Sequence, residues 1–226
     1  MNIRYLGHAG FEIKMNDQTL VFDPFVTPNP AAKHINIGDI KADYILITHA
    51  HGDHIADVEA IANANSSKCI SNYEIHNWLA TKDIPCHPLN HGGKADFEFG
   101  TAKYVNAIHT SSFPDGAYGG NPGGFVIWDD NQCFYHAGDT ALTLDMKLIP
   151  ETCPSLDFAI LPIGDNFTMG YEDAVIASEF IKCDRIIGCH FNTFAPITID
   201  TEKAKSAFEN KGKELILLDV GESIEI

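Results

Sequence analysis

Thr48-His49-Ala50-His51-Gly52-Asp53-His54 places four candidate metal ligands in one short stretch of the chain. The run that precedes it, Tyr44-Ile45-Leu46-Ile47, is apolar and rich in branched side chains, which predicts a buried strand. Residues 55–63 carry apolar side chains at helical spacing and predict a helix. The ligands therefore lie on a turn from the carboxyl end of a strand into a helix, where α/β folds bind their ligands.

The donors of this turn are three imidazoles and one carboxylate, a set that suits Zn, Mn, Fe or Ni. Small residues separate them and let the backbone bend closely around an ion. His49 and His51 are two residues apart and can point to one side, whereas Asp53 and His54 are displaced and can face a second ion. The alternative is a histidine-rich surface turn that binds nothing. The density of donors directly after a hydrophobic strand argues against it.

The composition argues against several classes of partner. The chain has 226 residues, of which 45% are hydrophobic, and its formal net charge is −16. An acidic surface repels polyanions, which disfavours nucleic acid or an anionic membrane as the main partner. No apolar run approaches the ~20 residues that a membrane-spanning helix requires.

The first residues and the cysteines indicate a compartment. Met1-Asn2-Ile3-Arg4 leads directly into a strand pattern, without the apolar region of a signal peptide. The six cysteines are scattered and form no Cys-x-x-Cys pair, which predicts reduced thiols in the cytoplasm rather than a disulfide framework. Cys189 lies beside His190, and we interpret it as a small packing residue rather than a ligand.

Apolar runs between turn signals predict many short strands. They are expected at residues 3–6, 11–14, 20–22, 68–71, 97–99, 101–108, 125–128, 133–136, 157–163, 185–189 and 215–218. Helices are expected at residues 73–81, 171–182 and 201–210. The second half thus repeats the layout of the first: hairpins, then alternating strands and helices. Stacked sheet on sheet with helices outside, the halves would give an α/β fold, a four-layer αβ/βα sandwich. We expect one domain over residues 1–226, with similar halves at 1–118 and 119–226.

Three further donors follow predicted strands. His109 comes after the run that ends at Ile108, Asp139 comes after strand 133–136 through a glycine, and His190 comes after strand 185–189. Together with the opening turn they make five histidines and two aspartates, which is enough for two ions. Only folding can gather residues so far apart along the chain.

A glycine-rich segment follows His109 directly. Residues 110–124 contain five glycines and two prolines, which predicts a long, mobile loop. Long loops in compact domains are usually functional or disordered, so we expect this one to border the site.

These motifs resemble those of the metallo-β-lactamase superfamily. The His-x-His-x-Asp-His turn, a lone downstream histidine, a Gly-Asp-Thr turn and a final histidine occur in the family's order and spacing. The resemblance implies the same fold and two divalent ions per chain, with Asp139 bridging them. One ion would take His49, His51 and His109. The other would take Asp53, His54 and His190.

Within the superfamily the chain is similar to small bacterial metal-dependent hydrolases near the L-ascorbate-6-phosphate lactonases. The matching stretches are Leu6-Gly7-His8-Ala9-Gly10-Phe11, Pro162-Ile163-Gly164, Phe167-Thr168-Met169-Gly170 and His190-Phe191-Asn192-Thr193-Phe194. They span nearly the whole chain and imply hydrolysis without naming a reaction. His136 is unusual, because an apolar or aromatic side chain is expected so close to Asp139.

The expected chemistry is attack of a metal-bridging hydroxide on a small ester, lactone or phosphoester. Bound metal lowers the pKa of water from ~15.7 to ~7, and Asp53 or Asp139 would be the catalytic carboxylate that orients the hydroxide and moves its proton. Zn and Mn are the expected ions, with Fe and Ni as alternatives. The residual positive charge of the centre favours a small, anionic substrate. The sequence leaves a homo-oligomer open.

Residues around the ligands are expected to assist. Asp23 is assigned to orient a ligating histidine, and the alternative is a turn-capping carboxylate before Pro24. Substrate contacts are expected from His8, Asn192, Thr193 and Tyr118. For His8 the alternative is a structural hydrogen bond, and for Asn192 and Thr193 it is the capping of a turn. Tyr118 lies on the glycine-rich loop, which could gate the site.

Three other functions remain open at this point. A metal-dependent nuclease or phosphodiesterase fits the superfamily, but the net charge and the lack of a basic segment disfavour it. A non-catalytic metal or ligand sensor would not need open coordination positions. A redox role with iron usually requires a flavin or an electron-transfer partner.

Overall fold

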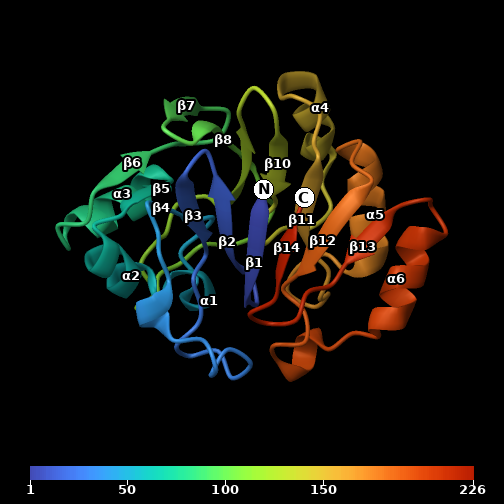
Figure 1. The fold of residues 1–226 in the computed structure, drawn as a ribbon, viewed down its shortest axis with the longest axis horizontal. Coiled ribbons are helices and arrows are strands. Elements are labelled where there is room, and N and C mark those ends of the chain that lie inside the picture. Colours follow the sequence, from blue (N-terminus) through green and yellow to red (C-terminus); the bar gives the residue numbers. More distant parts are fainter. The chain divides into compact units, whose positions relative to one another are not determined.

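The computed structural model describes residues 1–226, which form two compact units (Figure 1). Unit 1 comprises Met1–Asn90, Thr110–Pro122 and Asp219–Ile226, and unit 2 comprises His91–His109 and Gly123–Leu218. The division differs from the expected halves, because residues 91–109 belong to the second unit and the last eight residues belong to the first. The chain therefore passes from one unit to the other four times.

Unit 1 is built on a seven-stranded mixed sheet with the order β14-β1-β2-β3-β4-β5-β6. Its strands are β1 (Asn2–Gly7), β2 (Gly10–Met15), β3 (Gln18–Phe22), β4 (Tyr44–Leu46), β5 (Lys68–Ser71), β6 (Cys86–Pro88) and β14 (Ser223–Glu225). Strands β14, β1, β2 and β3 pair antiparallel, and β3 to β6 pair parallel. The connections carry η1 (Ile37–Asp39), α1 (Gly52–Ile55), α2 (Val58–Asn65) and α3 (Tyr73–Ala80).

Unit 2 has the same layout, with the sheet order β13-β12-β11-β10-β9-β8-β7. Its strands are β7 (Lys94–Phe97), β8 (Gly100–Asn106), β9 (Gly123–Trp128), β10 (Cys133–His136), β11 (Phe158–Pro162), β12 (Arg185–Cys189) and β13 (Glu214–Ile216). The first four in chain order pair antiparallel, and β10 to β13 pair parallel. The connections carry η2 (Leu144–Leu148), α4 (Ile149–Thr152), α5 (Tyr171–Phe180), η3 (Ala195–Ile197) and α6 (Thr201–Glu209).

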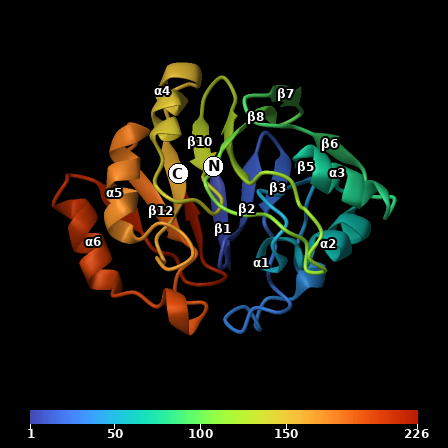
Figure 2. The same ribbon diagram turned by 180° about the vertical axis from the view of Figure 1, so that it is seen from behind.

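The repeated layout predicted from the sequence is therefore present in each unit. Each unit also has a hydrophobic cluster of its own, which in unit 1 contains Ile45, Ile61 and Leu79 and in unit 2 contains Leu161 and Phe208. Strands β4 and β11 are buried along their whole length, as expected for parallel strands whose faces are covered by connecting segments. In both views the helices of each unit flank the strands of the same unit (Figures 1 and 2).

Several boundaries differ from the sequence prediction for identifiable reasons. The helix expected at 55–63 is split into α1 and α2, because Asp57 leaves helical geometry and its Oδ2 accepts hydrogen bonds from the backbone N–H groups of Val26 (2.6 Å) and Thr27 (2.9 Å). The first hairpin of unit 2 turns before Gly100, which opens β8 at φ 130° against the carbonyl of Trp128. Strands β6 and β14 were not predicted, because each is short and neither carries a run of apolar residues.

The thiols and the helices bear on the expected compartment. All six cysteines are free, and burial raises the pKa of Cys86 and of Cys133 to about 12, so these thiols stay protonated at neutral pH. The longest helix, α5, has 10 residues, and none of the helices is long and apolar enough to cross a membrane.

Candidate metal centre

Several site residues predicted from the sequence directly follow strands at their carboxyl ends, and three of them, His8, Asp23 and His190, have a left-handed backbone. In unit 1, His8 follows β1 at φ 59° and Asp23 follows β3 at φ 40°. In unit 2, Gly138 precedes Asp139 at φ 62°, and His190 follows β12 at φ 54°. Left-handed conformations at non-glycine residues are unfavourable and cluster at functional sites. Both units thus hold strained turns at the edge where α/β sheets bind ligands.

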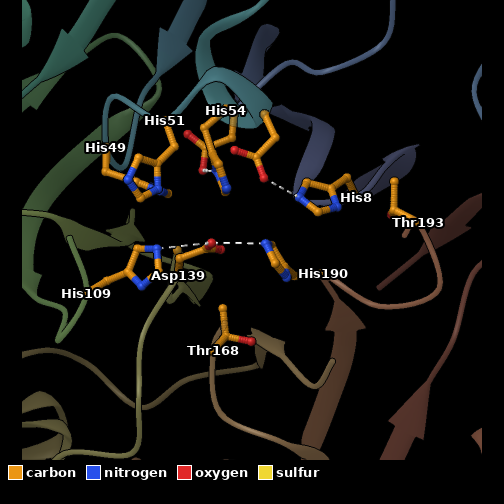
Figure 3. Close-up of polar contacts among 12 residues, drawn as sticks. His8, His49, His51, His54, His109, Asp139, Thr168, His190 and Thr193 are labelled. Carbon is orange, nitrogen blue, oxygen red and sulfur yellow. Dashed lines mark hydrogen bonds and ion pairs between the residues drawn. The ribbon is translucent and has the colours of Figure 1, made fainter. Parts of the chain in front are cut away.

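The imidazoles of His49 and His51 in unit 1 face one another (Figure 3). Nε2 of His49 lies 3.0 Å from Nδ1 of His51. Nδ1 of His49 lies 3.0 Å from the hydroxyl of Thr48, and that hydroxyl donates its proton to Asp23. His49 must therefore donate its Nδ1–H to Thr48, which leaves a lone pair on Nε2. Two nitrogen ligands on a tetrahedral zinc ion are separated by about 3.3 Å, so this spacing fits a shared ion.

Asp23 organises the ligand turn from behind. Its side chain is fully buried and accepts three hydrogen bonds: from the Thr48 N–H (2.8 Å), from the Thr48 hydroxyl (2.6 Å) and from Nδ1 of His54 (2.9 Å). The last bond fixes the tautomer of His54 and leaves a lone pair on its Nε2. Ligand atoms of Asp23, His49 and His54 lie within 4.8 Å of one another. Because both carboxylate oxygens already accept hydrogen bonds, we interpret Asp23 as the residue that orients His54 rather than as a ligand.

The imidazole of His8 contacts the carboxylate of Asp53, a predicted ligand in unit 1. Its Nε2 is 3.0 Å from Oδ2 of Asp53, and its side chain is buried, whereas that of Asp53 is 30% exposed (Figure 3). The hydroxyl of Tyr5 donates to the His8 carbonyl at 3.0 Å and holds the turn. The contact between His8 and Asp53 is a structural hydrogen bond, which is the alternative role that the sequence suggests for His8. Its expected contact with substrate stays a prediction.

The ligands of unit 2 centre on Asp139. Its Oδ2 lies 3.0 Å from Nε2 of His190 and 3.6 Å from Nε2 of His109 (Figure 3). The side chains of Asp139 and His190 are each 3% exposed, and that of His109 is 15% exposed. Oδ2 of Asp139 thus lies close to two predicted histidine ligands of the same unit. Neutral imidazole and carboxylate oxygen are also the donors that Zn and Mn accept, so the residues present fit the metals that the sequence predicts.

Thr140 joins the turns that carry His109 and Asp139 in unit 2. Its hydroxyl accepts a hydrogen bond from the Ile108 N–H at 3.0 Å, and the Ala141 N–H donates to the Ile108 carbonyl at 3.0 Å. These bonds draw the chain out of the sheet after Asn106, which explains why β8 ends earlier than predicted. The buried His136 accepts a hydrogen bond from the Gly138 N–H at 3.1 Å, so this unusual residue shapes the turn that carries Asp139.

The residues expected to contact substrate have local partners. Oδ1 of Asn192 accepts a hydrogen bond from the Ile199 N–H at 2.9 Å, which is the turn-capping alternative. The Thr193 hydroxyl donates to the Phe191 carbonyl at 3.4 Å. Tyr118 is 64% exposed, and its hydroxyl donates to Oδ1 of Asn121 at 2.9 Å. Their contacts with substrate stay predictions.

The sequence motifs assign no role to three hydroxyl residues that lie beside predicted ligands. They are Thr48, Thr140 and Ser111, and the last of these binds the peptide between His49 and His51. Thr48 and Thr140 directly adjoin predicted ligands, so adjacency to His49 and to Asp139 was the available signal. Nothing in the sequence pattern distinguishes Ser111 from its neighbour Ser112.

Comparison with known proteins agrees with the fold and with a metal-dependent hydrolase. A family model described as the beta-lactamase superfamily domain matches residues 2–190. A UPF0173 metal-dependent hydrolase of Christiangramia forsetii is 59% identical over the full length of both chains, and one of Thermus thermophilus is 43% identical over 100% of this chain and 99% of its own. The solved structure of Igni18, a metallo hydrolase from Ignicoccus hospitalis, has a TM-score of 0.89 at 31% identity and covers 100% of this chain and 98% of its own.

Two mixed sheets flanked by helices, with histidines and aspartates at their carboxyl edges, define a metal-dependent hydrolase with an α/β fold. The chain belongs to the metallo-β-lactamase superfamily, and within it to the UPF0173 metal-dependent hydrolases.

Proposed function

We propose that the chain binds two divalent ions and hydrolyses a small ester, lactone or phosphoester. The ligands would be the seven side chains that the motifs assign: His49, His51, Asp53, His54, His109, Asp139 and His190. The observation that carries the proposal is the position of Asp139 Oδ2 between two imidazoles within unit 2. A carboxylate with a histidine on each side is suited to bridge two ions. The donors favour Zn or Mn, with Fe or Ni as alternatives.

The bound ions would lower the pKa of water toward neutrality and polarise the carbonyl or phosphoryl oxygen, so that water attacks the adjoining carbon or phosphorus. Among the carboxylates, Asp53 is better suited than Asp139 to accept a proton from the attacking water. Its side chain is 30% exposed, whereas that of Asp139 is 3% exposed. The hydrogen bond from His8 holds Oδ2 of Asp53 in place. His8 therefore acts as a positioning residue.

A small anionic substrate fits this proposal better than a polymer. Histidines that bind metal are neutral, so two carboxylates only partly neutralise two divalent ions. The centre thus keeps a positive charge that attracts an anion. The net charge of −16 on the whole chain disfavours long polyanions such as RNA.

Metal analysis and a substrate survey test the proposal. Purified protein is loaded with Zn or Mn, its metal content is measured, and lactones, esters and phosphodiesters are assayed. We expect two ions per chain and turnover of at least one substrate class. Asp139→Asn should lose an ion and nearly all activity, whereas Asp130→Asn, on an exposed loop of the same unit, should match the wild type. Metal content well below one ion per chain would overturn the proposal, as would full activity of Asp139→Asn.

A further inference from the structure

Residues 110–122, called here the strap, belong to unit 1 although the chain on both sides belongs to unit 2. The strap is the yellow-green loop in Figure 2. The sequence predicts a long, mobile loop over this stretch, and the structure shows an irregular loop that makes specific contacts within unit 1. Phe113 is buried in the hydrophobic cluster of unit 1 and stacks on Trp78, with a ring separation of 4.9 Å. An apolar anchor of this kind holds the strap on unit 1 through contacts that its glycine content does not reveal.

Asn72 holds the far end of the strap. The side chain of Asn72 is buried, and its Nδ2 donates to the carbonyls of Gly119 (2.9 Å) and Asn121 (3.3 Å). Its Oδ1 accepts from the Ile75 N–H at 2.9 Å and caps α3. A single amide therefore joins the start of a helix to the strap.

Ser111 connects the strap to the metal-ligand turn. Its Oγ accepts a hydrogen bond from the Ala50 N–H at 3.1 Å and donates to the Gly119 carbonyl at 2.9 Å. Ala50 lies between His49 and His51, and both Ala50 and Ser111 are buried. Gly119 packs so closely that an added Cβ would collide with the Cβ of Ala50 and lie 2.7 Å from Oγ of Ser111. The peptide that separates two ligands is thus fixed by one hydroxyl and by close packing.

We propose that Ser111 is a positioning residue for the metal site, which acts by fixing the peptide between His49 and His51. The inference rests on the proposed function, because it assigns Ser111 to the site formed there. The hydroxyl matters because a buried N–H group without a hydrogen-bond acceptor costs free energy. Without Oγ of Ser111, the peptide of Ala50 would have to rotate for its N–H to reach another acceptor. Turning this peptide would move the imidazole nitrogens of His49 and His51 away from their 3.0 Å spacing.

Metal affinity, measured by competition with a chromophoric chelator, tests the role of Ser111. We expect Ser111→Ala to bind zinc about 10-fold more weakly than the wild type, the usual effect of removing a group that orients a ligand. Ser112→Ala is the matched control, because the half-buried Ser112 is on the same strap and is not placed at the site. The visible spectrum of the cobalt-loaded protein should change in Ser111→Ala and stay the same in Ser112→Ala.

A second variant tests the strap from its other end. Asn72→Asp keeps an oxygen to cap α3 but cannot donate to Gly119 or Asn121, so it should weaken zinc binding in the same direction. Melting of the metal-free proteins checks that each variant folds. If wild-type protein binds no metal, the proposed function fails. If the wild type binds two ions and both variants bind zinc as tightly as Ser112→Ala does, the proposed function stands and the role of Ser111 is refuted.

Discussion

Single hydrogen bonds decide which ring nitrogen of His49 and of His54 keeps a lone pair for a metal ion. Asp23 accepts the Nδ1–H of His54 and the hydroxyl proton of Thr48, and that hydroxyl in turn accepts the Nδ1–H of His49. One carboxylate therefore sets the tautomers of two predicted ligands, one of them through Thr48. Groups behind metal ligands commonly raise metal affinity in this way, because they remove the freedom of the ring to rotate.

Replacement of Asp23 should show this control. Asp23→Asn puts an amide where two donors converge, so one hydrogen bond is lost or His54 changes tautomer. We expect zinc affinity to fall by about 10- to 100-fold. Competition titration measures the change. Asp43→Asn, which alters an exposed carboxylate bound to the Thr19 N–H on the same sheet, should bind zinc as the wild type does. Equal affinities for the two variants would show that Asp23 does not orient a ligand.

Candidate ligands could be named from the sequence because their donor chemistry is visible there, and their binding of metal stays a prediction. Three histidines and an aspartate after an apolar run define a donor set before any fold is known. Asp139 and His190 could be added because each also follows a predicted strand. The role of Ser111 could not be predicted, because it depends on a peptide 61 residues away in the chain. Hydrogen bonds between distant segments leave no periodic signal.

At the scale of elements, buried strands were the easiest to predict. Strands β4 and β12 were predicted nearly to the residue, because strands covered on both faces are rich in branched apolar side chains. Strand β5 was also predicted to the residue, although Ile70 is its one branched apolar side chain. The edge strands β6 and β14 have no run of apolar side chains, and their pairing alone makes them strands. The glycines and prolines of the strap predict a mobile loop. The contacts made by Phe113 and Asn72 could not be predicted, because they join segments that are far apart in the chain.

The pairing of β1 with β2 leads to a prediction about pH. Glu12 is opposite Arg4 in this ladder, and its carboxylate lies 3.6 Å from the Arg4 guanidinium. Burial raises the pKa of Glu12, and Arg4 and Lys14 only partly offset this effect. The folded state thus binds the Glu12 proton more tightly than the unfolded state does. Its contribution to stability is present below the ordinary pKa of glutamate and is lost as pH rises through the raised value.

Glu12→Gln should remove this pH dependence. The variant should lose less stability than the wild type between pH 4 and pH 7 and should be at least as stable at pH 7, since an ion pair near the surface contributes little. Urea unfolding at several pH values measures the difference. Glu98→Gln, at an exposed position, should keep the wild-type dependence. A Glu12→Gln variant that is clearly less stable than the wild type at pH 7 would contradict the argument.

At the scale of the whole molecule, a metal ion that binds only the folded chain should stabilise it against unfolding. Any ligand that binds only the folded state adds free energy of unfolding, about 2.7 kcal/mol at a concentration 100 times Kd. For a chain of this size, zinc should therefore raise Tm by roughly 5–10 °C. Calorimetry with and without a chelator measures the shift. Asp139→Asn should show a smaller shift, and an unchanged wild-type Tm would argue against a metal held by the folded chain.

The last eight residues should matter to unit 1 although they follow unit 2 in the chain. Strand β14 pairs with β1, the Tyr5 N–H donates to the Glu222 carbonyl at 3.0 Å, and Val220 packs on the hydrophobic cluster. Deletion of residues 219–226 should lower the free energy of unfolding by on the order of 3 kcal/mol, from lost hydrogen bonds and lost apolar burial. Urea unfolding measures this loss, and a deletion variant as stable as the wild type would refute it.

The four passages of the chain between the units have a consequence for proteolysis. Residues 115–117 are exposed at the tip of the strap, where a protease could nick the backbone. Each of the two resulting fragments would carry strands of both sheets, because β8 pairs with β9 and β14 pairs with β1 across the nick. The fragments should therefore stay associated under native conditions and separate only in denaturant.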